Sequence, residues 1–439
     1  YIRNPHTNLP GPVHVPIIGN LLKLGKKPQE SLTVLAERYG PLMSLKLGTL
    51  TTIVVPSSAM AKEILQNNDQ SFSGRYVLDG MTYGRTFVLN GVTLENSHIF
   101  TTQKLDSNQN LRHQKFNDLV TYVGRNASSG SAIDIGQASF TTVLNLISNS
   151  FFSMDLADLS SDTVSTFKRA VRGVLLEAGK PNLSDFFPLL RFIDVQVIRR
   201  RTKKHVRILD ETFDKIIDKK MTLLQSREKN SASSGDLLDI ILDSSHENGI
   251  QLQRHEIKAL LRDFFAAGTD TSSSTIEWAM AELLHDPCKM IKVQQEISSI
   301  IGRDRPIEEP DIVRLPYLQA IVKETLGLHP PVLVNVWAIG RDPTIWAHPT
   351  CFKPERFLGS KLDYKGQDLE LIPFGSGRRI CPGLPLAHRM VHLVLGLLLQ
   401  SFDWKLENAL KPEDLDMKEE SGFTSVKTTG LRAIPTASL

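Results

Sequence analysis

The sequence predicts a mainly helical α+β fold, and three observations support this prediction. Between about residues 101 and 330 the apolar residues recur mostly at helical spacing, with few strand signals. Segments that alternate like strands concentrate near the two ends of the chain. Hydrophobic residues make up 41% of the 439 residues, a composition typical of globular proteins that excludes disorder as a description of the whole chain.

The N-terminal region is expected to mix extended chain, helix and strand. Four prolines within residues 1–20 exclude a helix there and predict a stiff hinge, which precedes a single domain over residues 21–439. The patterns that follow predict a helix over 32–39 with Gly40 as its C-cap, strands over 41–47 and 51–55, and a helix over 58–65 with Ser57 as its N-cap.

Four longer helices are expected in the remainder of the chain, because their apolar residues follow a helical period. They cover residues 255–284, 288–301, 318–328 and 385–402. A Gly-Lys-Pro-Asn segment at 179–182 breaks the helical pattern before them, and residues 227–235 are typical of an exposed loop.

Charge and cysteine content exclude some classes of protein. The 51 basic and 48 acidic residues give a net charge of +3, too small for a protein that mainly neutralises nucleic-acid phosphate. Three cysteines make no disulfide framework, and Cys288 and Cys351 are expected to be buried and inert. A basic cluster over 199–204 indicates either a solvated helix face or contact with a membrane surface. No segment has the length and apolarity of a transmembrane helix.

Residues 374–383 place one cysteine in a glycine-rich loop directly before a predicted helix. The thiolate is the form of cysteine that binds metals, and a helix N-terminus lowers the pKa of a cysteine. Gly375, Gly377 and Gly383 allow backbone amides to approach the sulfur of Cys381. Zinc is disfavoured, because no second cysteine lies nearby in the sequence. A haem iron held by a single thiolate fits this loop better.

A polar segment at residues 267–272 (Ala-Gly-Thr-Asp-Thr-Ser) interrupts an otherwise apolar helix. Most of these residues are poor helix formers, and Thr or Ser can bond to the carbonyl four residues earlier. One interpretation is a solvated kink. The other is a helix defect that opens a polar groove, in which Asp270 and Thr271 relay protons. The cysteine loop downstream favours the second interpretation.

Glu324 lies in the predicted helix over 318–328, and Arg356 follows in a Phe-Lys-Pro-Glu-Arg-Phe segment. A buried glutamate needs a partner, and Arg356 is a candidate. The pattern alone is weak, because ordinary surface ion pairs look the same.

These three features, in this order, resemble those of the cytochrome P-450 monooxygenases. The haem signature of that family, F-x-x-G-x-R-x-C-x-G, is matched by Phe374, Gly377, Arg379, Cys381 and Gly383. Residues 267–272 match the oxygen-activation motif, and 352–357 match F-x-P-E-R-F. Finer matches at 72–75, 179–182 and 337–343 resemble the plant subgroup that contains geraniol 8-hydroxylase and ferruginol synthase.

The resemblance implies the cytochrome P-450 fold and a haem b whose iron is held by the Cys381 thiolate. It implies that Arg379 anchors a haem propionate, that Phe374 packs near the sulfur, and that oxygen binds beside Ala267 and Gly268. Further implied roles are proton delivery by Asp270 and Thr271, structural pairing of Glu324 with Arg356, and an apolar pocket. The expected pocket residues are Phe264, Ala267, Thr271, the 76–95 loop, Phe423 and Thr424.

The resemblance also implies the substrate class and the partners. Hydroxylation of an apolar plant metabolite, a mono- or diterpenoid, is the expected reaction. Electrons would come from NADPH through the flavins of a separate cytochrome P-450 reductase, because this chain has no G-x-G-x-x-G or flavin motif. The proline-rich hinge over 1–20 resembles the one that follows the membrane anchor in microsomal members. This implies the cytosolic face of the endoplasmic reticulum membrane, aided by the region around 186–192.

Three internal departures from the family pattern stand out. Gly327 occupies the position of the arginine in the family motif E-x-x-R. The family helix with W-R-x-x-R-K has no match between Gly74 and Leu111. Pro331 runs almost directly into Asn335, where the family has a strand-containing stretch. Two other functions stay open. One is a haem-dependent isomerase or dehydratase of the same fold, against which the Asp270-Thr271 pair argues, since oxygen activation is what requires proton delivery. The other is a non-catalytic haem or ligand-binding protein, for which Gly327 is the reason.

Overall fold

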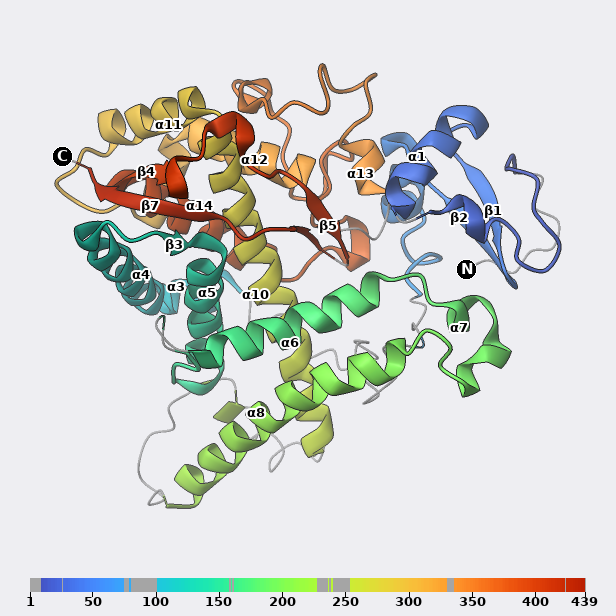
Figure 1. Ribbon diagram of the computed structural model, residues 1–439, viewed down its shortest axis with the longest axis horizontal. Helices are drawn as coiled ribbons and strands as arrows, with labels where there is room; N and C mark the ends of the chain where they lie inside the picture. The colour runs from blue at the N-terminus through green and yellow to red at the C-terminus, as the bar shows by residue number, and fades with distance from the viewer. Residues whose placement is uncertain are drawn as a thin grey trace.

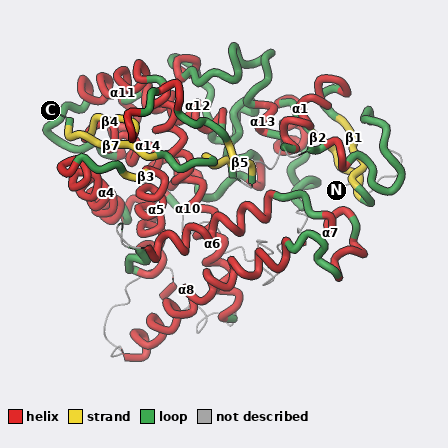
Figure 2. Tube along the Cα trace, viewed as in Figure 1, coloured by secondary structure: helices red, strands yellow, loops and turns green. Residues whose placement is uncertain are grey.

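The computed structural model describes residues 9–25, 27–74, 79, 101–157, 159, 162–226, 236, 238–239, 253–329, 335–422 and 424–438. Within these ranges helices dominate, and the strands form three small sheets (Figures 1 and 2). The mainly helical α+β class is therefore confirmed. Neither the 76–95 loop, apart from Asp79, nor Phe423 belongs to the described residues.

The N-terminal elements match their predictions closely. They are α1 (Pro28–Tyr39), β1 (Met43–Leu47), β2 (Leu50–Val54) and α2 (Ser58–Lys62). Gly40 caps α1 with a φ of 94°, and the Ser57 hydroxyl accepts a hydrogen bond from the Met60 amide. The predicted helix continues past α2 as a π-helical turn, Glu63–Asn67. Strands β1 and β2 pair antiparallel.

The described part of the hinge, residues 9–20, contains no helix and lies against β1. The Ser44 amide donates to the Pro10 carbonyl at 2.9 Å. Asn20 is buried; its side-chain oxygen accepts from the Lys46 amide at 2.9 Å, and its amide donates to the Val13 carbonyl at 3.1 Å. These bonds fix the direction in which the chain enters the fold.

Helices make up the central and C-terminal parts of the molecule. The first group is α3 (Thr102–Ser107), α4 (Gln109–Ser129), α5 (Ile135–Phe152), α6 (Asp162–Gly179), α7 (Leu183–Phe186) and α8 (Ile198–Ser226). The second group is α10 (Arg254–His285), α11 (Pro287–Ile300), α12 (Pro316–Leu328), α13 (Val336–Ile339) and α14 (Leu384–Ser401). Among the described residues, no helix combines the length and apolarity needed to cross a bilayer.

Helix α10 runs through the centre of the molecule and packs against α5, α6, α8, α12 and α14 (Figure 1). An aromatic cluster joins four of these helices. The Phe265 ring stacks on Phe152 of α5 at a centroid distance of 5.5 Å, and it contacts Phe167 of α6 and Phe213 of α8 at 6.2 and 5.3 Å. Because large aromatic rings dominate core energetics, this cluster fixes α10 in place.

Two small sheets lie toward the C-terminus. Strands β3 (Ile133–Asp134), β7 (Arg432–Ala437) and β4 (Phe402–Leu406) form one, in the order β3-β7-β4. Strands β5 (Glu419–Ser421) and β6 (Ser425–Lys427) form a hairpin. Strand β3 was not predicted, because two residues carry no periodicity and pair only with a strand that is distant in sequence.

Candidate active site

The cysteine loop closes on itself directly before α14. The Cys381 amide donates to the Phe374 carbonyl at 2.9 Å. Gly375 and Gly377 have φ angles of 74° and 63°, which favour glycine. A Cβ on Gly377 would lie 1.7 Å from the Leu65 carbonyl oxygen, so a larger residue cannot fit without moving the loop.

Two opposing effects act on the Cys381 thiol. Burial raises its pKa, whereas hydrogen bonds from the backbone amides of Gly383 and Leu384 act to lower it. The predicted lowering by the helix N-terminus is therefore wrong for the protein alone, because desolvation of a thiolate outweighs two amide dipoles. A bound cation changes this balance, since a coordinating thiol is deprotonated.

The other face of the loop packs on residues 63–73. The Gln66 side-chain amide donates to the Gly366 carbonyl at 2.8 Å and to the Ser376 hydroxyl at 3.1 Å. Arg379 is exposed and donates to the Ser73 carbonyl through two nitrogens, at 2.9 and 2.6 Å. Gln66 was not predicted, because its partners lie about 300 residues away in the chain.

One stripe of α10 stays accessible within an otherwise buried stretch of helix. Between Phe264 and Thr275 the residues with solvent access are Phe264, Ala267, Gly268, Thr271 and Thr275. They recur at three- and four-residue spacing and so share one helix face. Three predicted pocket residues, Phe264, Ala267 and Thr271, therefore lie together on this open face. Thr275 was missed, although its spacing from Thr271 could have shown it.

Helix α10 is continuous through residues 267–272, so the predicted helix defect is wrong. The predicted back-bonding does occur: the Thr271 hydroxyl donates to the Ala267 carbonyl at 2.6 Å, and the Thr269 hydroxyl donates to the Phe265 carbonyl at 2.5 Å. The tertiary packing of α10 outweighs the weak propensity of this segment.

Asp270 and Thr271 occupy different faces of α10. The Asp270 side chain is buried, and its Oδ2 accepts a hydrogen bond from the Thr424 hydroxyl at 2.7 Å. Burial raises the pKa of Asp270, while the Thr424 hydroxyl and the cations of Arg172 and Lys168 act to lower it. Asp270 is therefore a buried acid behind the open face.

Glu324 and Arg356 form the predicted pair. The Arg356 Nε lies 3.0 Å from Glu324 Oε2, and the Lys353 amide donates to Glu324 Oε1 at 2.7 Å. Arg356 also donates to the carbonyls of Ala347 and Cys351 at 2.8 and 2.9 Å. Burial raises the pKa of Glu324 despite these partners.

Gly327 leaves room for a side chain beside this pair. A Cβ there would meet Leu371 Cδ1 at 3.4 Å, a contact that a leucine side chain can relieve. Gly327→Arg is expected to raise the free energy of unfolding by about 1 kcal/mol through helix propensity and by about 1–2 kcal/mol more through charge-assisted hydrogen bonds to Glu324. Thermal unfolding measures the gain.

The matched control is Gly327→Ala, which supplies the propensity without the charge. An arginine variant no more stable than the alanine variant would show that Arg356 and the Lys353 amide already satisfy Glu324.

Cys288 and Cys351 are both exposed, so the prediction that they are buried is wrong. They line one open surface pocket of about 410 Å³, together with Tyr317 and Glu355. Among the described residues no group of three or more His, Cys, Asp or Glu side chains is placed to hold a metal ion.

Comparison with known proteins identifies the family. The model of the cytochrome P-450 family matches residues 9–333 and 331–431. The chain belongs to this family and is therefore a haem-dependent monooxygenase. Its relatives include geraniol 8-hydroxylase of Catharanthus roseus, 47% identical over 99% of this chain and 95% of the relative. Geraniol 8-hydroxylase of Swertia mussotii is 46% identical over 97% of this chain and 93% of the relative. Geranylhydroquinone 3″-hydroxylase of Arnebia euchroma is 43% identical over 97% of this chain and 93% of the relative.

The comparisons also bear on the internal departures. The three alignments extend over 474, 464 and 465 positions, more than the 439 residues of the chain. Each relative therefore has residues without a counterpart here. The family match divides into two stretches that meet at residues 331–333, where the sequence departs from the strand-containing stretch of the family. Residues 330–334 themselves lie outside the described ranges.

The family implies a haem, and the loop fits one. Cys381 is a free thiol that keeps some solvent access, and its sulfur accepts two backbone hydrogen bonds. Such bonds stabilise a thiolate ligand without supplying a competing one. Arg379, one of two exposed arginines in the same loop, can pair with a propionate.

Proposed function

We propose that this monooxygenase hydroxylates a terpenoid, with a geranyl-type monoterpenoid as the first candidate. The support is that the names of its relatives specify geraniol and geranylhydroquinone. The accessible stripe on α10 adds Phe264 and Ala267, which offer an apolar contact surface. A pocket that is mostly apolar with few polar groups suits such a substrate.

Within this proposal each site residue has a distinct task. Cys381 would hold the haem iron and Arg379 a propionate, with Phe374, Gly375, Gly377 and Gly383 shaping the loop. The haem supplies oxygen activation when bound. Phe264, Ala267, Thr271 and Phe423 would contact substrate, and oxygen would bind beside Ala267 and Gly268. Asp270 and Thr271 would hold and pass the protons that oxygen activation consumes.

Electrons would come from NADPH through a separate flavin-containing cytochrome P-450 reductase. The support is the absence of a Gly-rich dinucleotide or flavin motif in the sequence. The reaction then consumes one O₂ and two electrons for each hydroxyl group formed.

The test combines a spectrum with turnover. The dithionite-reduced protein should show a strongly red-shifted Soret band with carbon monoxide, which reports thiolate ligation. With reductase, NADPH and O₂ it should then hydroxylate geraniol. A red-shifted band with consumption of an organic hydroperoxide but no use of NADPH would favour the isomerase or dehydratase. A band with neither reaction would favour a ligand-binding protein.

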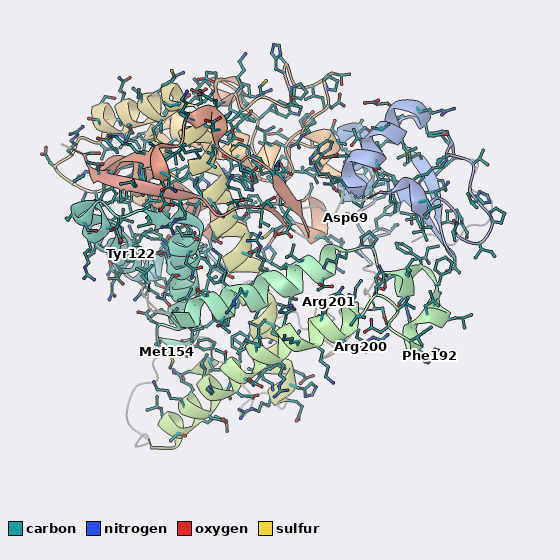
Figure 3. All side chains as sticks on the ribbon, in the orientation of Figure 1. Asp69, Tyr122, Met154, Phe192, Arg200 and Arg201 are labelled. Atoms are coloured by element: carbon teal, nitrogen blue, oxygen red, sulfur yellow. The ribbon has the colours of Figure 1, made fainter. Side chains whose placement is uncertain are left out.

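We also propose that the segment after α7 contacts the endoplasmic reticulum membrane from its cytosolic face. Three apolar side chains there are strongly exposed: Leu189 at 84%, Phe192 at 90% and Ile193 at 63%. Arg200, exposed at 70%, lies at the start of α8 (Figure 3). Apolar side chains beside exposed cations suit an anionic membrane surface.

Vesicle flotation tests this surface. Phe192→Asp should lower the fraction of protein bound to vesicles that contain anionic lipid by about tenfold, because burying an aspartate in the interface costs more than 1.4 kcal/mol. The control is Val313→Asp, which changes a residue that is 78% exposed on another part of the molecule. Equal binding by both variants would exclude this segment as the contact.

A further inference from the structure

Three residues on one face of α10 hold the turn between β5 and β6. Asp270, Ser274 and Trp278 follow each other at four-residue spacing and so point in one direction. The Thr424 hydroxyl donates to Asp270 Oδ2 at 2.7 Å. The Ser274 hydroxyl and the Trp278 indole nitrogen both donate to the Ser425 carbonyl, at 3.0 and 3.1 Å. These three hydrogen bonds therefore hold the turn in one position on this face of α10.

The same hairpin is tied to α6. Arg172 donates to Glu420 Oε2 at 3.0 Å and to the Lys427 carbonyl at 3.1 Å. Arg172 is also one of two α6 cations, with Lys168, whose charges act on Asp270. The hairpin, α6 and α10 thus meet around one buried carboxyl group.

The Asp270 carboxyl group is held away from the open face. Its side chain is buried behind the accessible stripe, and Thr424 is the side chain that donates to it. Thr271, the next residue, reaches the open face but turns its hydroxyl back to the Ala267 carbonyl. The hydroxyl of Thr424 therefore determines the direction in which the Asp270 carboxyl group points.

We propose that Thr424 is a positioning residue, which orients the Asp270 carboxyl group and, by stabilising the carboxylate left after proton transfer, makes it a stronger acid for proton delivery. The inference rests on the proposed function, because it needs Asp270 to serve as the acid. A hydroxyl that donates to a carboxylate stabilises the charged form, and this matters most where water is excluded. Thr424 acts through Asp270 and touches no reacting atom in this role.

The variant Thr424→Val keeps the shape and removes the hydroxyl, and Thr424→Ser restores it. In Thr424→Val, turnover should fall about tenfold. This is less than the full rate enhancement of a positioned proton donor, because Asp270 itself is still present. The alkaline limb of its pH profile, on which the acid loses its proton, should move upward by about one unit, the size expected for one lost hydrogen bond to a carboxylate. Thr424→Ser should restore both, and substrate-induced spectral shifts should keep the same half-saturation.

A second measurement needs no turnover. Without the hydroxyl, the pKa of Asp270 rises further, so ionising it in the folded state costs more. The stability lost in Thr424→Val should therefore grow as pH rises through the folded pKa of Asp270, which lies above its ordinary 3.8, and thermal unfolding measures it. In an Asp270→Asn background the same substitution should cost an amount that does not depend on pH.

The outcomes separate the two proposals. A loss of stability that is equal at all pH values, with an unchanged pH profile, would overturn the role of Thr424 and leave the monooxygenase intact. If the wild-type protein does not hydroxylate geraniol, geraniol is excluded as the substrate. If the double-mutant cycle of Thr424 and Asp270 nevertheless depends on pH, the link between these two residues is still supported.

Discussion

Replacing Cys381 with serine should remove the red-shifted Soret band of the reduced carbon monoxide complex and abolish hydroxylation. The alcohol of serine does not ionise near neutral pH and donates far less electron density than a thiolate, which is the ligand that favours O–O cleavage. Product formation should fall by several orders of magnitude. The fold should survive, because the loop is held by backbone contacts such as the bond from the Cys381 amide to the Phe374 carbonyl.

The matched controls are Cys288→Ser and Cys351→Ser. Both thiols are exposed, so each variant should keep the wild-type spectrum and activity. Loss of the band in either control, or its retention in Cys381→Ser, would contradict the assignment of Cys381 as the ligand. Circular dichroism of all three variants would separate loss of the ligand from loss of the fold.

Replacing His329 with leucine should cost about 3–5 kcal/mol of folding free energy, because it leaves the carboxylates of Glu282 and Glu419 without their charged partner. His329 is the C-cap of α12, and its side chain is only 8% exposed. Its Nε2 lies 3.1 Å from Glu282 Oε1, and its Nδ1 lies 2.9 Å from Glu419 Oε1. The ring stacks on Trp278 at 3.8 Å. Since both ring nitrogens face carboxylates, both donate, and the ring is an imidazolium.

The pH dependence of this stability follows from the pKa shifts of His329 and Glu419. Burial alone would lower the pKa of His329, but the two carboxylates raise it above its ordinary 6.5. The stability that this shift supplies is complete below pH 6.5 and is lost as pH rises through the folded value. Burial would raise the pKa of Glu419, but His329 holds it below its ordinary 4.5. That contribution is present above pH 4.5 and is lost as pH falls through the folded value.

The stability difference between wild type and His329→Leu should therefore be largest between pH 4.5 and 6.5 and shrink at alkaline pH. Chemical denaturation across this range measures it. His329→Gln is the control, since its amide can donate to one carboxylate without charge; it should lose less at every pH. A difference that is constant from pH 4.5 to 9 would show that His329 contributes by packing on Trp278 and not by charge.

Local signals in the sequence were strong enough to predict much of the fold and the centre of the site. The helix over 318–328 and the caps at Gly40 and Ser57 were predicted because each depends on residues a few positions apart. The cysteine loop was predicted for the same reason, since its glycines and Cys381 act on each other within ten residues. Arg356 was found as the partner of Glu324 because both belong to recognisable motifs.

Other features depend on contacts between distant segments, and only the tertiary structure decided them. The polar segment of α10 stays helical because packing against α5 and α14 outweighs its weak propensity. Asp270 turns to Thr424, 154 residues away, because the β5–β6 hairpin brings a hydroxyl to the buried face. The sequence by itself determined which residues are the candidates for binding haem and carrying protons. The packing of α10 between α6 and the hairpin decided where the acid points, because a buried carboxyl group must face whichever donor the fold supplies.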